Sequence, residues 1–238
     1  MLEAFGLSDP GCVRTNNEDY FINDTECGIF ILADGMGGAN AGERASQLSA
    51  ETLWERLRAV AHLDGDGALE SAFTEANDKV RKEAGTLPEL EGMGTTLLVA
   101  RDIGGSRLQV GSVGDSRAYL ASGGELAPLT EDQTWVAEVG SRLGLSDEAL
   151  KKHPMRHVLT MAVGTAEELR VFSRTVQLHP GDQVLLCSDG LHGVLNENIL
   201  RDTLKSEKDL PDKCHYLIDA AKAAGGPDNV TVVLIQLT

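Results

Sequence analysis

Four aspartates stand beside apolar runs, where their side chains could meet and do chemistry. Asp34 follows the run in GIFILADGMGG, and Asp189 follows the run in QVLLCSDG. Asp228 precedes the run in GGPDNVTVVLIQL, and Asp115 lies between two runs in LQVGSVGDSRAYL. An Asp-Gly pair alone is an ordinary turn, because glycine accepts positive φ and aspartate hydrogen-bonds its own backbone. Four acids in such places are more than turns require.

These carboxylates would repel one another if their strands were neighbours, unless a cation lay between them. Oxygen ligands with no Cys/His pattern nearby favour a hard ion, Mg²⁺ or Mn²⁺, over zinc. The glycines that follow Asp34 and Asp189 would let a backbone carbonyl approach such an ion. From these residues alone, a metal site and a set of ordinary turns are both open.

The stretch DPGCVRTNNEDYF adds a cation near the start of the chain. Arg14 precedes Glu18 by four residues, and Asp19 is adjacent to Glu18. A guanidinium can hold a phosphate with two parallel hydrogen bonds. By itself, however, the stretch is more simply a solvated arginine with two surface acids.

The overall charge limits the class of partner. The chain has 238 residues, with 37 acidic against 21 basic side chains and a formal net charge of −16. This balance repels phosphate backbones and argues against nucleic-acid binding. An acidic protein that acts on phosphate needs local arginines or bound cations. The length and even composition predict one domain over residues 1–238.

Cysteine usage and hydropathy indicate the compartment. The four cysteines form no CxxC pair, as expected for a reducing environment. The first residues lack a basic region before an apolar stretch, and no apolar run reaches the length of a membrane span. We therefore expect a cytoplasmic protein that does not bind membranes.

The elements that must position these acids can be read from hydrophobic periodicity. Amphipathic helical patterns cover residues 42–61, 68–84 and 210–224. Strand-like runs cover residues 28–33, 95–101, 107–113, 117–121, 171–178, 183–187 and 230–237. The order of these elements predicts an α+β sandwich with helices outside.

Two connections carry further predictions. The turns at Gly104-Gly105 and Gly114-Asp115 separate strand-like runs, so we expect hairpins and antiparallel pairing. Residues 135–154 show no clear core face, and we predict an inserted flap over residues 135–157.

Taken together, the chain resembles the type 2C metal-dependent protein phosphatases, the PPM family, in their compact bacterial form. The resemblance runs along nearly the whole chain, and its specificity comes from the order and spacing of many pieces. It implies two antiparallel sheets packed face to face with helices on both outer faces. The segments are SDPGCVRTNNEDYF, ILADGMGGANAGERAS, GMGTTLLVA, VGSVGDSRAYL, LTEDQTW, HPMRHVLTMAVGT, LLCSDGLHGVL and GGPDNVTVVLI.

The resemblance implies a catalytic centre with two Mn²⁺ or Mg²⁺ ions. Asp34 would bridge the two ions, and the Gly35 carbonyl would bind one of them. Asp189 and Asp228 would complete the other, and Arg14 would bind the substrate phosphate.

Further residues would support this centre. The resemblance implies that Glu18 reaches a metal through a water and that Asp19 and Asn229 support these ligands. Asp115, together with Asp189, would hold a weaker third ion.

The activity implied is hydrolysis of phosphoserine and phosphothreonine on proteins. Water activated by the two ions would attack phosphorus, so no cysteine or serine nucleophile is expected. The partners would be phosphorylated proteins and a cytoplasmic Ser/Thr kinase system, and the protein would act as a monomer. Two alternatives stay open: a catalytically silent module that binds a phosphoprotein, and a hydrolase of small phosphate esters or diesters on the same metals.

Three residues depart from the family pattern. Met36 stands where many eukaryotic members have a histidine that protonates the leaving oxygen, which leaves the general acid open. Gln133 and Thr134 stand where many relatives have His-Ser, just before the predicted flap, which leaves the flap contacts open.

Other patterns are not interpreted as ligand sites. His153 and His157 are four residues apart, but Pro154 between them argues against a helix, so we expect loop side chains. His192 is expected to face solvent or cap a turn. The stretch GMGGANAG is not a dinucleotide loop, because Asn40 replaces its third glycine, and no G-K-[ST] follows for a P-loop.

Overall fold

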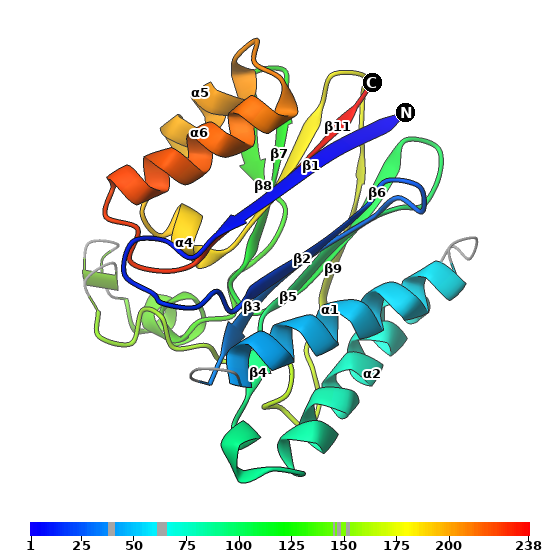
Figure 1. Cartoon of the computed structure of the whole chain (residues 1–238). Coiled ribbons are helices and arrows are strands. Elements are labelled where there is room, and N and C mark those ends of the chain that lie inside the picture. Colours follow the sequence, from blue (N-terminus) through cyan, green and yellow to red (C-terminus); the bar gives the residue numbers. More distant parts are fainter. Residues whose placement is uncertain (38–40, 61–65, 145, 147–148, 151–152) are drawn as a thin grey trace.

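Two antiparallel β-sheets lie face to face at the centre of the molecule (Figure 1). The computed structural model describes residues 1–37, 41–60, 66–144, 146, 149–150 and 153–238. The first sheet has the spatial order β1 (Leu2–Asp9), β11 (Val230–Leu237), β10 (Gln183–Cys187), β7 (Arg117–Ser122) and β8 (Glu125–Pro128). The second has the order β2 (Asp19–Asp24), β3 (Ile29–Met36), β5 (Leu97–Asp102), β6 (Arg107–Val113) and β9 (Phe172–Gln177), with β4 (Gly94–Thr95) paired to β3.

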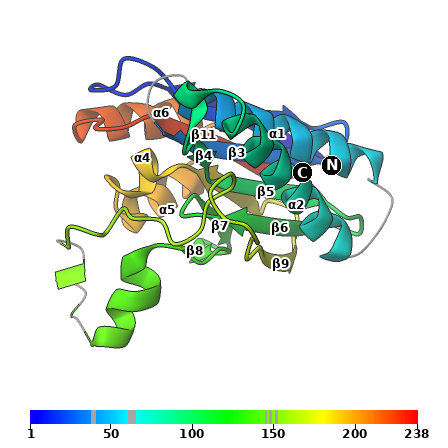
Figure 2. The same cartoon turned by 90° about the horizontal axis from the view of Figure 1, so that it is seen from below.

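Helices cover the outer face of each sheet, as Figure 2 shows from below. The first sheet is covered by α4 (Asp189–His192), α5 (Glu197–Lys205) and α6 (Leu210–Ala223). The second is covered by α1 (Ala41–Ala59) and α2 (Asp66–Ala84). The predicted α+β sandwich with helices on both outer faces is confirmed. Shorter helical turns are the 3₁₀ turns Pro88–Leu90 and Ser141–Leu143 and the π turn Val136–Gly140.

The strand β3 shows why this architecture needs unbroken apolar runs. Successive side chains of a strand point to opposite faces. Phe30 and Leu32 pack between the two sheets with Val184, whereas Ile31 packs with Leu53 in the layer between the second sheet and its helices. Both faces of β3 are therefore buried, which accounts for the run GIFILA.

Most predicted elements lie where expected. The runs at 107–113, 183–187 and 230–237 match β6, β10 and β11 residue for residue. The three helical patterns correspond to α1, α2 and α6, with ends that differ by at most two residues.

The strands β1, β2 and β8 and the helices α4 and α5 lie outside the predicted ranges. All three strands stand at the edges of their sheets and are largely half-buried or exposed, so their sequences mix polar and apolar residues. A local signal existed for α5, because the Asn196 side chain caps it by accepting the Ile199 N–H at 3.1 Å.

The turn at Gly114 and Asp115 is not the hairpin that its sequence predicts. β6 ends at Val113 in the second sheet, and β7 begins at Arg117 in the first sheet. The chain therefore crosses between the sheets here, whereas the turn containing Gly104 joins β5 to β6 as predicted. Asp115 therefore lies at the end of the sandwich where the chain passes from the second sheet to the first.

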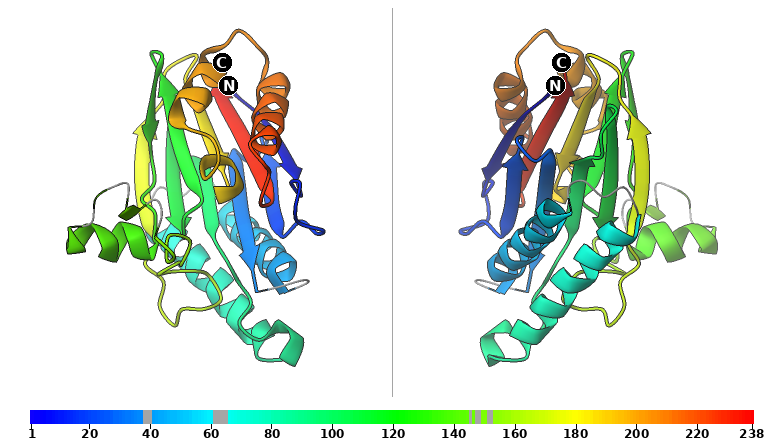
Figure 3. Two further views of the ribbon diagram at one scale, coloured as in Figure 1. Left: turned by 90° about the vertical axis from the view of Figure 1, so that its left-hand side faces the viewer. Right: turned by 90° about the vertical axis from the view of Figure 1, so that its right-hand side faces the viewer.

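The described residues of the segment predicted to form a flap, 135–157, project from the side of the sandwich (Figure 3). An antiparallel bridge between Thr134 and Leu159 closes its base. Residues 145, 147–148 and 151–152 of this segment lie outside the described residues, as does Asn40 of the GMGGANAG stretch. The flap, like the single domain over 1–238, stays a prediction.

Two observations bear on the expected environment. Cys187 and Cys214 are buried free thiols, Cys12 is an exposed one and Cys27 is partly exposed. Across the described ranges, no helix combines the length and the apolar character that a membrane crossing requires.

The layer between the sheets gives a first prediction. Replacing the fully buried Phe30 by alanine leaves a cavity there and should lower the free energy of unfolding by about 3–5 kcal/mol. Urea unfolding followed by circular dichroism measures the change. Leu87→Ala, at a side chain that is 48% exposed, is the control and should cost less than about 1 kcal/mol. Equal losses in both variants would contradict the assignment of this core.

Candidate functional site

One cavity of about 820 Å³ collects the acids that the sequence singles out. It lies where the end of β3, the crossing from β6 to β7 and the adjacent ends of β10 and β11 come together. Asp19 lies just behind its wall. The predicted site residues that line it are Arg14, Glu18, Asp34, Gly35, Asp115, Asp189, Asp228 and Asn229.

Asp34 is held by its backbone. Its N–H donates to the Thr96 hydroxyl at 3.0 Å, and its carbonyl accepts from the Thr95 hydroxyl at 2.8 Å. It lies opposite Asp19 in the β2–β3 register. The strand continues through Met36, so Asp34 lies within β3 rather than after it, contrary to the sequence interpretation. The two threonines were not identified from sequence, although GMGTTLLVA contains them.

Gly35 is required by packing. A Cβ at this position would overlap the carbonyl of Gly42, so β3 lies directly against the first turn of α1. A Cβ at Gly42 would in turn overlap the carboxylate of Glu18. The Glu18 carboxylate therefore lies beside the start of a long helix, where free N–H groups and the helix dipole favour an anion. Sequence reasoning missed Gly42.

Asp189 and Asp228 are brought together by antiparallel neighbours. β10 ends two residues before Asp189, β11 begins two residues after Asp228, and Cys187 pairs with Val232. A Cβ at Gly190 would overlap the carbonyl of Asn229, so the two segments touch through their backbones. Close backbone packing therefore requires the glycines that follow Asp34 and Asp189, whether or not their carbonyls also bind a metal.

Asp19 is buried, with 8% of its surface exposed. Its Oδ2 accepts from the Ser188 hydroxyl at 2.8 Å, and Ser188 also accepts the Thr231 N–H at 3.0 Å. The other carboxylate oxygen, Oδ1, has no hydrogen-bond partner within the described part of the chain. An unpartnered oxygen on a buried acid is costly unless a proton or a cation compensates it. Ser188 was not identified from sequence.

Burial and mutual repulsion act on the whole set. Burial raises the pKa of Asp34 well above its ordinary value, and the neighbouring charges of Asp19 and Asp189 add to the shift. Burial, and then Asp189, raise the pKa of Asp115 to about 8. Burial also raises the pKa of Asp19 to about 7. For Asp189, burial and the charge of Asp228 raise the pKa, while a hydrogen bond with Asp34 opposes the shift. Together these shifts disfavour the charged form of the acids unless positive charge is supplied.

Arg14 supplies one positive charge at the rim. Its Nη2 donates to Oδ2 of Asp228 at 2.8 Å, and the arginine side chain is 51% exposed. Asn229 ties the same region to the N-terminal loop. Its Oδ1 accepts the Glu18 N–H at 2.8 Å, and its Nδ2 donates to the carbonyl of Asn16 at 2.8 Å.

Two side chains fix the turn that carries Asp115. Gln133 accepts the Gly114 N–H at 2.8 Å through its side chain and donates to the carbonyl of Arg170 at 2.7 Å. His192 was expected to face solvent or cap a turn, and it caps this one, because its Nε2 donates to the Asp115 carbonyl at 3.0 Å. Burial lowers the pKa of His192 to about 4, so the ring is neutral.

The two histidines near the predicted flap have different surroundings. His153 stacks on Trp135, with ring centroids 4.6 Å apart. His157 lines the cavity, with its Nδ1 3.9 Å from Oδ2 of Asp189. His157 is thus nearer the candidate site than a loop position alone predicts.

The donor set fits hard divalent cations. The side chains predicted to bind the ions are all carboxylates, and the unpartnered oxygen of Asp19 and the raised pKa values indicate that positive charge is lacking. Among the described residues, no three His, Cys, Asp or Glu side chains stand ready-made to hold one ion. One oxygen of Asp228 is instead engaged by Arg14. Ion binding would therefore require side-chain rotations within the cavity.

Comparisons with known proteins agree with this geometry. A sequence model of the family described as protein phosphatase 2C matches residues 13–231. The serine/threonine protein phosphatase PstP of Mycobacterium tuberculosis is 38% identical over 244 residues, which cover 100% of this chain and 45% of that protein. The chain thus spans about half the length of that relative.

Two further relatives match this chain over nearly their whole length. The serine/threonine phosphatase Stp of Listeria welshimeri is 36% identical over 236 residues, covering 96% of this chain and 93% of that protein. The crystal structure of the catalytic domain of PstP in complex with two manganese ions has a TM-score of 0.87 at 34% identity. It covers 99% of this chain and 97% of its own.

The raised pKa of Asp115 predicts a pH-dependent stability. Between its ordinary value of 3.8 and about 8, the folded state holds a proton that the unfolded chain has released. The free energy of unfolding of metal-free protein should therefore fall as pH rises through this range. Asp115→Asn imitates the protonated acid, so in the presence of chelator it should be more stable than wild type by about 1–3 kcal/mol at pH 8 and equal near pH 4.

Urea unfolding at pH 4, 6 and 8 with a chelator measures this difference. The control is Asp219→Asn, an exposed acid on α6, which should leave the pH profile unchanged. An Asp115→Asn profile as steep as that of the wild type would contradict the prediction.

Proposed function

The chain belongs to the protein phosphatase 2C family, and we propose that it hydrolyses phosphoserine and phosphothreonine esters on proteins. The observation that carries this proposal is the single cavity in which four aspartates from distant segments meet the guanidinium of Arg14. The relatives in Mycobacterium and Listeria support it, because both are named as serine/threonine phosphatases.

Two Mn²⁺ or Mg²⁺ ions are the counter-charge that this proposal assigns to the cavity. Asp34 would contact both ions, and the Gly35 carbonyl would contact one. Asp189 and Asp228 would complete the other. When bound, such ions lower the pKa of a water molecule and so supply a nucleophile near neutral pH. The PstP structure with two manganese ions supports this assignment.

The remaining acids have supporting roles in this proposal. Glu18, beside the start of α1, would reach an ion through a water, and Asn229 holds the Glu18 backbone in place. Asp19 would stabilise the positive charge from behind through its free oxygen. Asp115 and Asp189 would hold a third ion.

Arg14 is proposed to bind the substrate phosphate. Its guanidinium lies at the open rim of the cavity and pairs with Asp228. Once Asp228 holds an ion, the Arg14 guanidinium would be free to donate two parallel hydrogen bonds to phosphoryl oxygens. It would then stabilise the charge that develops on those oxygens.

Met36 lines the same cavity, and its thioether carries no acidic proton. The proton for the leaving serine or threonine oxygen must therefore come from another group in the cavity or from solvent.

The cellular setting follows from the same proposal. Substrates would be the products of a Ser/Thr protein kinase, and the enzyme would act as a cytoplasmic monomer. The free thiols support a reducing compartment, and the net charge of −16 argues against nucleic-acid substrates.

Removal of the central carboxylate tests the proposal. Wild-type protein with Mn²⁺ should release phosphate from a phosphothreonine peptide and stop when a chelator is added. Asp34→Ala should lower kcat by about 10³-fold, because it removes the ligand shared by both ions. The matched control is Asp219→Ala, an exposed acid on α6, which should retain full activity.

The other outcomes separate the alternatives. Absence of turnover on phosphopeptides, nucleotides and diesters with Mn²⁺ present would indicate a silent binding module. Faster turnover of small esters or diesters than of phosphopeptides would indicate a small-molecule hydrolase. Turnover that survives Asp34→Ala unchanged would remove the proposed centre.

Arg14 gives an independent prediction. Arg14→Ala should lower kcat/KM for a phosphothreonine peptide by about 10²-fold, since one charged phosphate contact is lost in the transition state. Arg14→Lys should recover only part of this loss, because an ammonium lacks the planar fork. Arg81→Ala, at an exposed arginine of α2, serves as the control. Equal kcat/KM for Arg14→Ala and Arg81→Ala would exclude phosphate binding by Arg14.

A further inference from the structure

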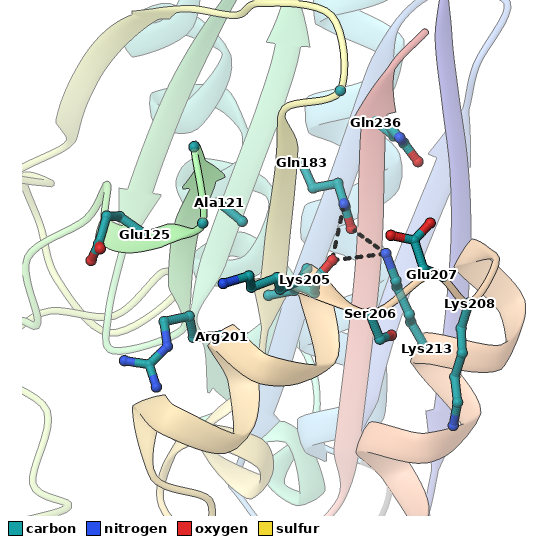
Figure 4. Close-up of a pocket in the computed structure, with 14 residues that line it drawn as sticks. Ala121, Glu125, Gln183, Arg201, Lys205, Ser206, Glu207, Lys208, Lys213 and Gln236 are labelled. Atoms are coloured by element: carbon teal, nitrogen blue, oxygen red, sulfur yellow. Dashed lines mark hydrogen bonds between the residues drawn. The ribbon is translucent and has the colours of Figure 1, made fainter.

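A second cavity of about 490 Å³ lies at the opposite end of the first sheet from the candidate site (Figure 4). Gln183, the first residue of β10, lies in its floor, whereas the other end of β10 leads to Asp189. The strand rise places Gln183 about 13 Å from Cys187, so the two cavities are separate. The β7–β8 turn, the end of α5 and the start of α6 form the walls.

A buried ammonium lines this cavity. Lys213 is only 4% exposed, and its Nζ donates to the Leu204 carbonyl at 2.8 Å and to Gln183 Oε1 at 3.2 Å. Both bonds are drawn as dashed lines in Figure 4, together with the bond from Gln183 Nε2 to the same Leu204 carbonyl at 3.1 Å. An ammonium has three N–H donors. The described residues supply two acceptors and place no carboxylate within 4.0 Å of Nζ, so one donor and the positive charge are left for a ligand.

Two more cations stand around the same space. Lys205, the last residue of α5, reaches the β7–β8 turn, where its Nζ is 3.7 Å from the position that a Cβ would take at Gly124. It forms no ion pair within the part of the chain that the structure describes. Arg201, one turn earlier on α5, donates to Asp202 at 3.1 Å.

The other charged residues of the lining weaken this positive charge without cancelling it. Lys208 lines the cavity, but its ammonium lies over the ring of Tyr216, 4.7 Å from the centroid. Glu125 and Glu207 are the acids of the lining. Burial lowers the pKa of Lys213, and the charge of Glu207 opposes this shift from beyond ion-pair distance.

This local balance is the reverse of that of the whole chain. Four basic and two acidic side chains line the cavity, whereas the chain has 21 basic and 37 acidic residues. A hollow with an excess of one sign of charge attracts counter-ions. Capping of the α5 C-terminus accounts for the bond from Lys213 to Leu204, but not for the hollow or for Lys205 on its far side.

We propose that this cavity binds a phosphate-bearing anion, either a free phosphate or the phosphorylated side chain of a protein. A phosphoryl group carries close to two negative charges and three acceptor oxygens. Among the described residues, Lys213 and Lys205 are the lining ammoniums that neither a carboxylate nor an aromatic ring engages, so they are the donors best placed to meet it. The lining is largely polar and has no aromatic side chain, so it does not suit an apolar ligand or a nucleobase. This inference does not depend on the proposed catalytic function.

Site-resolved NMR titration tests the proposal. Inorganic phosphate is added to ¹⁵N-labelled protein in the presence of chelator, and the amide signals of Gly123, Gly124 and Gly181 report on this cavity. Gly35 and Gly190 report separately on the candidate catalytic site. The titration is repeated with a phosphoserine peptide and with its unphosphorylated form.

Saturable shifts of the three glycines are expected with phosphate, with the phosphopeptide, or with both, and the stronger ligand identifies the source. The double variant Arg201→Gln/Lys205→Gln should bind about tenfold more weakly or worse. Lys82→Gln, at an exposed lysine of α2, should bind as the wild type does. Lys213→Met should also weaken binding, and circular dichroism establishes whether it folds.

Two results would overturn the proposal. One is the absence of shifts at Gly123, Gly124 and Gly181 with both phosphate ligands. The other is equal affinity in wild type and in a folded Arg201→Gln/Lys205→Gln variant. Because these glycines are read separately from Gly35 and Gly190, failure here leaves the catalytic proposal untouched.

Discussion

Mutual repulsion of buried carboxylates is the constraint on which the rest of this structure depends. Asp34, Asp115 and Asp189 share one cavity, and Asp19 lies directly behind it. Burial and the neighbouring negative charges raise the pKa of each acid, so folding brings together carboxylates that repel one another in this cavity. Such an arrangement lowers stability, and the cation and phosphate binding proposed for this cavity would compensate it.

The fold holds these charges together by close backbone packing. Gly35 lies against Gly42, and Gly190 lies against the carbonyl of Asn229, with no space for a Cβ in either place. A hydrogen bond from Ser188 to Asp19 connects the first sheet to β2, and one from the Glu18 N–H to Asn229 connects it to the N-terminal loop. The apolar layers on both faces of each sheet give this edge a rigid base.

The first sheet carries opposite charge at its two ends. At one end, Asp189 and Asp228 flank β10 and β11 in the acidic cavity. At the other end, Lys213 and Lys205 line the basic cavity. An anion meets favourable charge at the basic end directly, whereas at the acidic end it depends on bound cations and on the few basic side chains of the lining, Arg14 and Arg156 among them.

The sequence by itself determined the elements and the identity of the acids. Strand and helix periods are local, so β6, β10 and β11 could be located to the residue. Asp34, Asp189 and Asp228 could be selected because they stand beside the apolar runs 28–33, 183–187 and 230–237. The half-buried edge strands β1, β2 and β8 were missed because half-buried strands need no continuous apolar pattern.

Only the tertiary structure decided which of these residues meet. The turn at Gly114 has the composition of a hairpin, yet the chain crosses between sheets there. The reason is that β6 pairs with β5 and β9, whereas β7 pairs with β10 and β8. Some of the deciding contacts join segments that are well separated in the sequence. They are the contacts of Ser188 with Asp19, of Gln133 with Gly114 and of Lys213 with Gln183. No local sequence pattern encodes these contacts, because hydrogen bonds and electrostatic interactions depend on distances that are set only when the chain folds.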